Sequence, residues 1–352
     1  MIWFQLLLLF ATNASAASAD SASLEKPALS WKNARVGDAP RFELLALADG
    51  WLGLVATKGK VQFRSPTGKW SDVLELPTDD VRSIASAGSG ILVGGERHAS
   101  LDPTVFFVGI DGRIGETWNM PHDVLHSVAA WKGARWATVS GYFWRASPDG
   151  LLELLSGGKV VRHAEIPAVK VDVRFEVPWN AVLHLGPAGE RIFCVPHECG
   201  PDFCHYSYCY RGDGDKVVWQ QFGRWWFQPV PCGDYLIEQE YAVPDRHLSF
   251  PRNRTIVRRI TDGVQVATVR TGADTGISCA GPDEFLLNAG KSITSFSLPS
   301  GRRRWSMPVP VRVGNVVQLA RAGTCTIALT DRDAMVSICQ GVGEKMVTTV
   351  TR

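Results

Sequence analysis

Three polar segments of the sequence combine histidine, arginine and acidic side chains. They are ERHASLDPT after Gly95, PHECGPDFCH around Pro201 and YAVPDRHLSFPRN around Arg246. Imidazole, guanidinium and carboxylate groups that converge can bind carboxylate, phosphate or sugar ligands, and can act as acid and base. The candidate binding residues are His122, Asp123, His126, His197, Glu198, His205, Arg246 and His247, with Arg97, His98, Asp102, Asp202 and Arg252 nearby.

A second polar pattern repeats along the chain, with Asp-Val followed closely by a basic residue. It occurs at 80–82, 123–126 and 172–174. Asp side chains at the start of a strand commonly accept backbone N–H groups and fix the turn. We therefore expect a structural role for the repeated Asp residues. Ligand binding is a hypothesis to test at two groups, His122 with Asp123 and His126, and His197 with His205.

The spacing of the eight cysteines predicts four disulfides. Cys194–Cys209 and Cys199–Cys204 share one midpoint at Pro201-Asp202, as partners on an antiparallel hairpin do, and Pro-Asp suits a turn. Cys325 and Cys339 share a midpoint at Arg332 in the same way. The remaining pair, Cys232 and Cys279, occupies similar points of consecutive repeats and is expected to join them. Because the step from Cys194 to Cys199 is odd, the first hairpin needs a bulge or an irregular tip.

The alternative interpretation of this hairpin is a metal site made of Cys194, His197, Cys199, Cys204, His205 and Cys209. The gap between successive cysteines is at the upper limit of the C-x₂₋₄-C spacing typical of zinc sites, and an exported protein favours disulfides. We therefore expect no metal and no cofactor. The sequence also contains no G-x-S-x-G, H-E-x-x-H, Gly-rich phosphate loop or EF-hand loop, so it assigns no catalytic residue.

Export is predicted by the first 19 residues. The apolar run from Met1 to Phe10 is followed by small residues, and cleavage after Ala16, Ala17 or Ala19 suits a signal peptide. The alternative is a membrane anchor. A membrane-spanning helix needs about 20 apolar residues, however, and the chain contains no apolar run of that length. We expect a secreted or periplasmic protein with no membrane span after cleavage, an N-terminal extension over 20–40 and a folded domain over 41–352.

The sequence pattern around these residues predicts an all-β protein built from repeats. Three short apolar runs precede each glycine turn, and another run follows it, in several cases with Trp70, Trp118, Trp219 or Trp305. The turns end at Gly68, Gly112, Gly158, Gly214, Gly263, Gly301 and Gly343. Four strands roughly every 40 to 50 residues predict a single seven-bladed β-propeller with four-stranded antiparallel blades, and a β-sandwich is the alternative. In such a ring, the three polar segments are expected to share one face.

Two segments resemble known propeller repeats. LPTDDVRSIASAGSGILVGG at Leu76 to Gly95 resembles the two-component regulator propeller repeat, and the unit at 120–150 is similar in outline. SGRRRWSM at Ser300 to Met307 is similar to the closing turn and Trp of pyrroloquinoline quinone-type repeats. The first resemblance implies a periplasmic sensing or ligand-binding propeller.

Composition narrows the function further. The chain is 45% apolar, and its 37 Lys+Arg against 35 Asp+Glu give a net charge of +2. These values exclude a disordered chain and argue against nucleic acid as the partner. We expect a monomeric, exported binding or scaffolding module that presents one loop-rich face to a protein, glycan or small molecule. The alternatives are an exported hydrolase or lyase with its site at the channel mouth, and a glycan-binding lectin.

Overall fold

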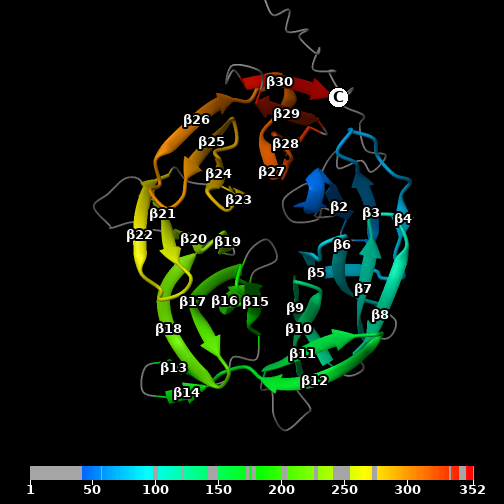
Figure 1. Cartoon of the computed structure of the whole chain (residues 1–352), viewed down its shortest axis with the longest axis vertical. Helices are drawn as coiled ribbons and strands as arrows, with labels where there is room; N and C mark the ends of the chain where they lie inside the picture. The colour runs from blue at the N-terminus through cyan, green and yellow to red at the C-terminus, as the bar shows by residue number, and fades with distance from the viewer. Residues whose placement is uncertain are drawn as a thin grey trace, which may run out of the picture.

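Seven four-stranded antiparallel blades form a ring in the computed structural model of the chain (Figure 1). The structure describes residues 42–351 except 57, 98–101, 121–122, 142–149, 172–173, 177–179, 200–203, 226–228, 241–253, 272–275, 333 and 341–345. The first strand of each blade lies at the centre of the ring and the fourth at its rim (Figure 1). The predicted all-β, seven-bladed propeller is therefore confirmed, whereas the predicted signal peptide and extension lie outside the described residues.

Blades 1 to 3 take the first twelve strands in chain order, and a short 3-10 helix, η1 (Ala48–Gly50), joins the first two. The strands are β1 (Phe42–Ala46), β2 (Leu52–Ala56), β3 (Lys60–Arg64), β4 (Leu74–Glu75), β5 (Asp80–Ser86), β6 (Gly90–Glu96), β7 (Pro103–Gly109), β8 (Ile114–Asn119), β9 (Asp123–Trp131), β10 (Ala134–Gly141), β11 (Gly150–Ser156) and β12 (Lys159–Glu165).

A two-stranded hairpin, β13 (Val169–Val171) and β14 (Arg174–Glu176), separates these blades from blades 4 to 7. The strands of the later blades are β15 (Val182–Leu185), β16 (Arg191–Cys199), β17 (Cys204–Asp213), β18 (Lys216–Trp225), β19 (Val230–Cys232), β20 (Tyr235–Glu240), β21 (Arg254–Arg259), β22 (Gln265–Arg270), β23 (Gly276–Gly281), β24 (Glu284–Asn288), β25 (Ser292–Ser297), β26 (Arg303–Pro308), β27 (Val316–Ala322), β28 (Cys325–Thr330), β29 (Met335–Gln340) and β30 (Met346–Thr351). A second 3-10 helix, η2 (Val311–Val313), precedes β27.

Glycine turns between the third and fourth strands explain why the sequence reveals the blade count. Six of the seven predicted turn glycines have a positive φ, a region that side-chain-bearing residues rarely adopt. They are Gly68, Gly112, Gly158, Gly214, Gly263 and Gly301. Position 343 falls between β29 and β30, outside the described residues. Each predicted turn therefore separates the third strand of a blade from its fourth.

The apolar core is divided among the interfaces between neighbouring blades. Phe63 of blade 1 packs with Ile91 and Phe106 of blade 2, for example, and each sheet buries both of its faces in this way. The same kind of contact closes the ring, because Leu44 of blade 1 belongs to one cluster with Ile327 of blade 7. Each blade is one continuous segment in the described part of the chain, so the first and last blades meet without sharing a strand ladder.

Side chains on the innermost strands also link the blades. Each innermost strand has a free edge whose backbone groups need partners. Four polar side chains, which we call the inner-strand belt, bond to such an edge in the next blade. Ser83 Oγ accepts from Val128 N–H (3.0 Å), Ser127 Oγ from Leu183 N–H (2.9 Å) and Gln318 Oε1 from Leu44 N–H (2.7 Å), while Ser278 Oγ donates to Leu319 O (2.9 Å).

Three of the four predicted disulfides are confirmed. They are Cys194–Cys209 within blade 4, Cys325–Cys339 within blade 7 and Cys232–Cys279 between the innermost strands of blades 5 and 6. The strand register places Cys199 opposite Cys204, but the side chains of this pair lie outside the described residues, so the fourth bond stays a prediction.

The hairpin that carries two of these pairs has the irregularity that its cysteine spacing requires. The register of β16 against β17 shifts on both sides of Pro196, so that His197 on one strand and Ser207 on the other have no direct partner. One extra residue on each strand makes the ladder distance from Cys194 to Cys199 even, although the sequence step is odd. The expected bulge is therefore present.

Candidate functional site

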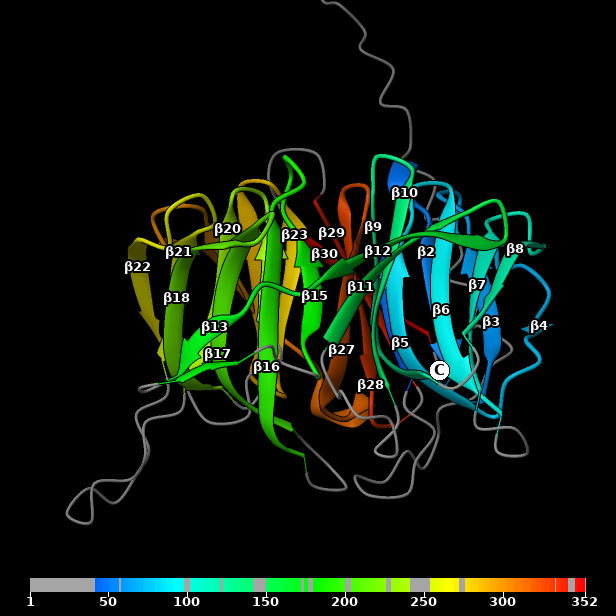
Figure 2. The ribbon, with the colours of Figure 1, turned by 90° about the horizontal axis from the view of Figure 1, so that it is seen from below.

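The two ends of the ring differ in their connections. The connections between second and third strands, which include 97–102, 142–149, 200–203 and 241–253, belong to one end, together with the connections between blades. We call this the loop end, the lower edge in Figure 2. The opposite turn end contains tight turns such as Lys132-Gly133. All three polar segments of the sequence fall in second-to-third-strand connections, and the blade 4 segment is largely an extended β16–β17 hairpin.

Most of the predicted binding residues have side chains outside the described part of the chain. His122, Arg246 and His247 lie outside it altogether, and Asp123 is described only as the first residue of β9. His197, Glu198 and His205 belong to the β16–β17 hairpin, where Glu198 pairs with His205 in the register. Ligand binding by these residues stays a prediction. His126 is the one member of the set whose side chain the structure describes.

His126 bonds the first strand of blade 3 to the second. Its Nε2 lies 2.8 Å from the Ser140 hydroxyl, and burial lowers the pKa of the imidazole to about 4, so the ring is neutral at pH 7. A serine this close to a neutral histidine has the spacing of an activated nucleophile. Ser140 is only 1% exposed, however, so its hydroxyl is not open to a substrate. This geometry supports a structural role for the pair.

In two of its three occurrences, at 80–82 and 123–126, the repeated Asp-Val pattern marks a bulge in an innermost strand. The third, at 172–174, falls at the turn between β13 and β14 and lies partly outside the described residues. The register of β5 skips Arg82 and the register of β9 skips His126, so the basic residue of the pattern is the bulged residue in both blades. Arg82 forms ion pairs with Asp80 (3.2 Å) and Glu96 (3.1 Å). A bulge re-aims the side chain at the loop end of the strand, which accounts for the pattern in these two blades without a ligand.

The metal interpretation of the β16–β17 hairpin loses two of its ligands, because Cys194 and Cys209 are bonded to each other. Within the described ranges, no group of three or more His, Cys, Asp and Glu side chains is placed to hold a metal ion. Nor does any helix in those ranges have the length and apolar character needed to cross a membrane.

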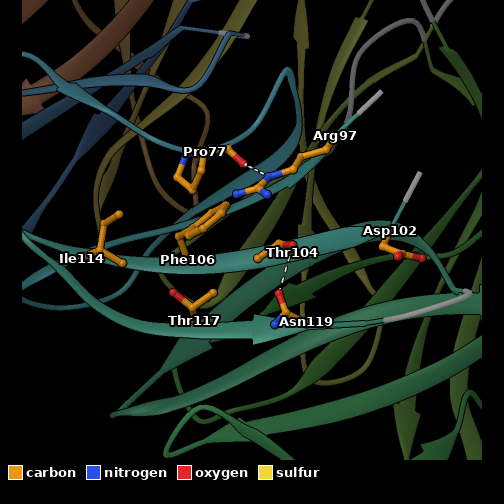
Figure 3. A pocket seen from close by; sticks show the side chains of 8 residues that line it. All are labelled: Pro77, Arg97, Asp102, Thr104, Phe106, Ile114, Thr117 and Asn119. Atoms are coloured by element: carbon orange, nitrogen blue, oxygen red, sulfur yellow. Dashed lines mark hydrogen bonds between the residues drawn. The ribbon is translucent and has the colours of Figure 1, made fainter. Parts of the chain in front are cut away.

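A pocket of about 540 Å³ opens between blades 1 and 2, beside the 97–102 connection (Figure 3). It is lined by Pro77, Arg97, Asp102, Thr104, Phe106, Ile114, Thr117 and Asn119. Of these, only Arg97 and Asp102 fall among the candidates that the sequence suggests. Thr104, Thr117 and Asn119 were missed because they alternate along β7 and β8 with buried residues, and Phe106 was missed because it is itself a core residue.

A second unusual feature is a group of buried polar side chains at the interface between blades 5 and 6. Gln239 and Thr255 are 2% and 0% exposed and lie opposite each other on β20 and β21. Their side chains have no hydrogen-bond partner, and neither does the Thr271 hydroxyl just after β22. Ile237 and Val257, two residues along on the same face, pack against blade 6. The unpartnered groups therefore face blade 6.

Comparisons with known proteins bear on the fold. No protein-family model matches the chain, and no curated protein matches it in sequence. A chain of hydrazine synthase from Kuenenia stuttgartiensis is similar in structure, with 12% identity and a TM-score of 0.57 over 91% of this chain and 97% of that one. The β-propeller domain of Cps50 (Swd1) from Myceliophteria thermophila has 9% identity and a TM-score of 0.54, over 90% and 98%. These likenesses show that the chain has the β-propeller fold.

Proposed function

We propose that the chain is an exported binding module that presents the loop end of its ring to a protein partner. The observation that carries this proposal is the unequal character of the two ends. The longest second-to-third-strand connections, at 142–149 of blade 3 and 241–253 of blade 5, belong to the loop end. Most connections at the turn end, such as Lys132-Gly133, are tight turns, and the exception is 65–73 between β3 and β4. Binding residues concentrate on loops that a rigid scaffold positions, and the interblade cores and inner-strand belt supply that scaffold.

Export is the second part of the proposal. Disulfides persist in oxidising compartments and are rare in the cytosol, and three bonds join described cysteines of this chain. The predicted signal peptide at 1–19 agrees with them. Expression of the full chain with its own N-terminus in a bacterial host tests this part. The mature protein is expected in the periplasm or medium, beginning at residue 17, 18 or 20, and an uncleaved cytosolic product would contradict export.

The binding surface is tested by altering each end of the ring separately. In the loop-end variant, a Gly-Ser link joins Glu240 directly to Arg254. In the matched control, Gly-Ser is inserted at the turn end between Lys132 and Gly133. Cross-linking in the exporting cells, followed by quantitative mass spectrometry, compares both variants with the unaltered chain. We expect specific cross-linked proteins to be lost from the loop-end variant and retained by the control, and equal profiles for both would contradict the proposal.

A further inference from the structure

The pocket between blades 1 and 2 exists because the fourth strand of blade 1 is very short. β4 contains only Leu74 and Glu75, whereas β7 and β8 of blade 2 have seven and six residues. The inner part of the blade 2 sheet is covered by blade 1, since Phe63 and Leu76 pack with Ile91 and Val93. Phe106 and Val108 of β7 are also covered, whereas Ile114, Thr117 and Asn119 of β8 stay partly or well exposed. The resulting cavity of about 540 Å³ falls within the usual range for small-molecule sites.

Four neighbouring side chains from two strands form the floor of this pocket. Thr104 and Phe106 on β7 lie opposite Asn119 and Thr117 on β8, so all four share one face of the sheet (Figure 3). Thr104 donates a hydrogen bond to the Asn119 carbonyl oxygen at 3.3 Å, which leaves the Asn119 amide nitrogen available as a donor. Ile114 adds an apolar surface and is 39% exposed. The floor therefore combines donors with exposed carbon.

Arg97 is held over this floor by its own backbone anchor. Its Nε donates to the Pro77 carbonyl oxygen at 2.6 Å, and its two terminal nitrogens extend above Phe106 (Figure 3). Other arginines near blade 2 are ion-paired, Arg82 with Glu96 and Arg135 with Glu116. No ion pair joins Arg97 to a described carboxylate. The terminal edge of the guanidinium is thus oriented and open to a ligand.

The chemistry of these groups selects the ligand. The terminal nitrogens of arginine match a carboxylate in a planar, two-bond geometry, and such charge-assisted bonds are stronger than neutral ones. Asp102 also lines the pocket, and its negative charge disfavours a dianion such as phosphate. We propose that the pocket binds a monocarboxylate, with the carboxylate on Arg97 and the Asn119 amide and the adjoining carbon skeleton on Ile114. This site lies at the loop end, but binding of a small acid does not require the proposed protein partner, so either proposal can fail without the other.

The test uses pairs of probes that differ only in charge. The first pair is 3-phenylpropionate and 3-phenylpropionamide, and the second is the tripeptide acetyl-Ala-Ala-Phe as its free acid and as its amide. Ligand-observed NMR and calorimetry on the full mature chain measure binding. We expect at least one acid to bind about tenfold or more tightly than its amide, because the amide cannot replace the charge-assisted bonds. Binding of 3-phenylpropionate identifies free organic acids as the source, and binding of the peptide acid alone identifies C-terminal carboxylates.

Variants then locate the bound acid. R97Q is expected to weaken it about tenfold or more, R97K to weaken it less, and I114A to weaken it by a few-fold. R113Q is the matched control, because Arg113 is a well-exposed arginine on the same blade outside the pocket. Circular dichroism confirms that each variant is folded. Equal binding of acids and amides, no binding by any acid, or an equal loss in R97Q and R113Q would overturn the proposal.

Discussion

The junction between blades 2 and 3 and the junction between blades 5 and 6 connect equivalent innermost strands by different means. At the first, Ser83 on β5 accepts a hydrogen bond from Val128 N–H on β9. At the second, β19 is only three residues long and is joined to β23 by the Cys232–Cys279 disulfide. The first junction has a polar bond between two long strands. The second relies on a covalent link, and the same interface buries the unpartnered side chains of Gln239 and Thr255 farther along β20 and β21, nearer the loop end.

The difference shows that the ring does not require one particular chemistry between its blades. A hydrogen bond is sufficient to link two blades where their long innermost strands bring many backbone and apolar groups together. Where the innermost strand is short and the interface buries unsatisfied amide and hydroxyl groups, each such group costs about 1 to 3 kcal/mol, and a disulfide offsets that cost by restricting the unfolded chain. The two junctions should therefore respond to different perturbations.

Removing the covalent link should have the largest effect. The double substitution C232A/C279A is expected to lower the free energy of unfolding by about 4 kcal/mol on the chain-entropy view, because the bond closes a segment with a sequence separation of 47. Guanidinium titration measures the loss. The control is C325A/C339A, with a separation of 14 and an expected loss of about 3 kcal/mol. An equal or smaller loss in C232A/C279A would remove the special role of the blade 5–6 junction.

Acid should destabilise blade 3, the blade that contains His126. Burial lowers the pKa of His126 on β9 from 6.5 to about 4, so between these values the unfolded chain binds a proton that the folded chain does not. Stability should therefore be full above pH 6.5 and fall as the pH drops toward 4, by up to about 3 kcal/mol for this one group. H126Q should lose that part of the pH dependence in urea titrations at pH 7.5 and 4.5. If both proteins lose equal stability in acid, His126 is not a source of it.

The polar junction itself can be weakened at one atom. S83A removes the acceptor of the Val128 N–H group and is expected to cost about 1 kcal/mol. S86A is a matched control on the same strand. Hydrogen exchange adds a local readout, since the Val128 amide should exchange faster in S83A alone. Equal exchange in the two variants would mean that the belt adds nothing to this junction.

The smallest expected effect has the opposite sign. Replacing the unpartnered pair in Q239L/T255V removes buried polar groups that make no hydrogen bond, so stability should stay equal or rise by about 1 kcal/mol. Q62L is the control, because buried Gln62 donates to the Ser71 carbonyl oxygen at 2.8 Å and its loss should destabilise the chain. A clear loss of stability in Q239L/T255V would show instead that this interface holds water or a ligand.

The fold was predictable because its signals are local. Turn glycines such as Gly112 and Gly263 need a positive φ whatever surrounds them, and cysteine pairs with one midpoint need only a hairpin. The inner-strand belt was not predictable from these signals. Ser83 and Ser127 lie within runs that read as ordinary strands, and only the assembled ring brings each one to the edge of the next blade.

The candidate site was predictable only in part, for a related reason. Arg97 and Asp102 stand out because they belong to a polar segment between strands. The pocket beside them depends on the pairing of β4 stopping after two residues, although the surrounding sequence, SDVLELP, reads as a longer strand. The number of residues that β4 pairs depends on its hydrogen bonds to β3, and the sequence pattern of one strand does not reveal it.

The continuity of each blade has a consequence for the order of the chain. Because β27 to β30 follow one another and none of the described strands is exchanged with blade 1, the ring can be circularly permuted without breaking any described ladder within a blade. By the topology of the ring, β30 ends at the loop end, where β1 begins, so a linker between them would form a seventh connection of the existing kind. New termini between β4 and β5 would then make blade 2 the first blade of an otherwise equivalent propeller.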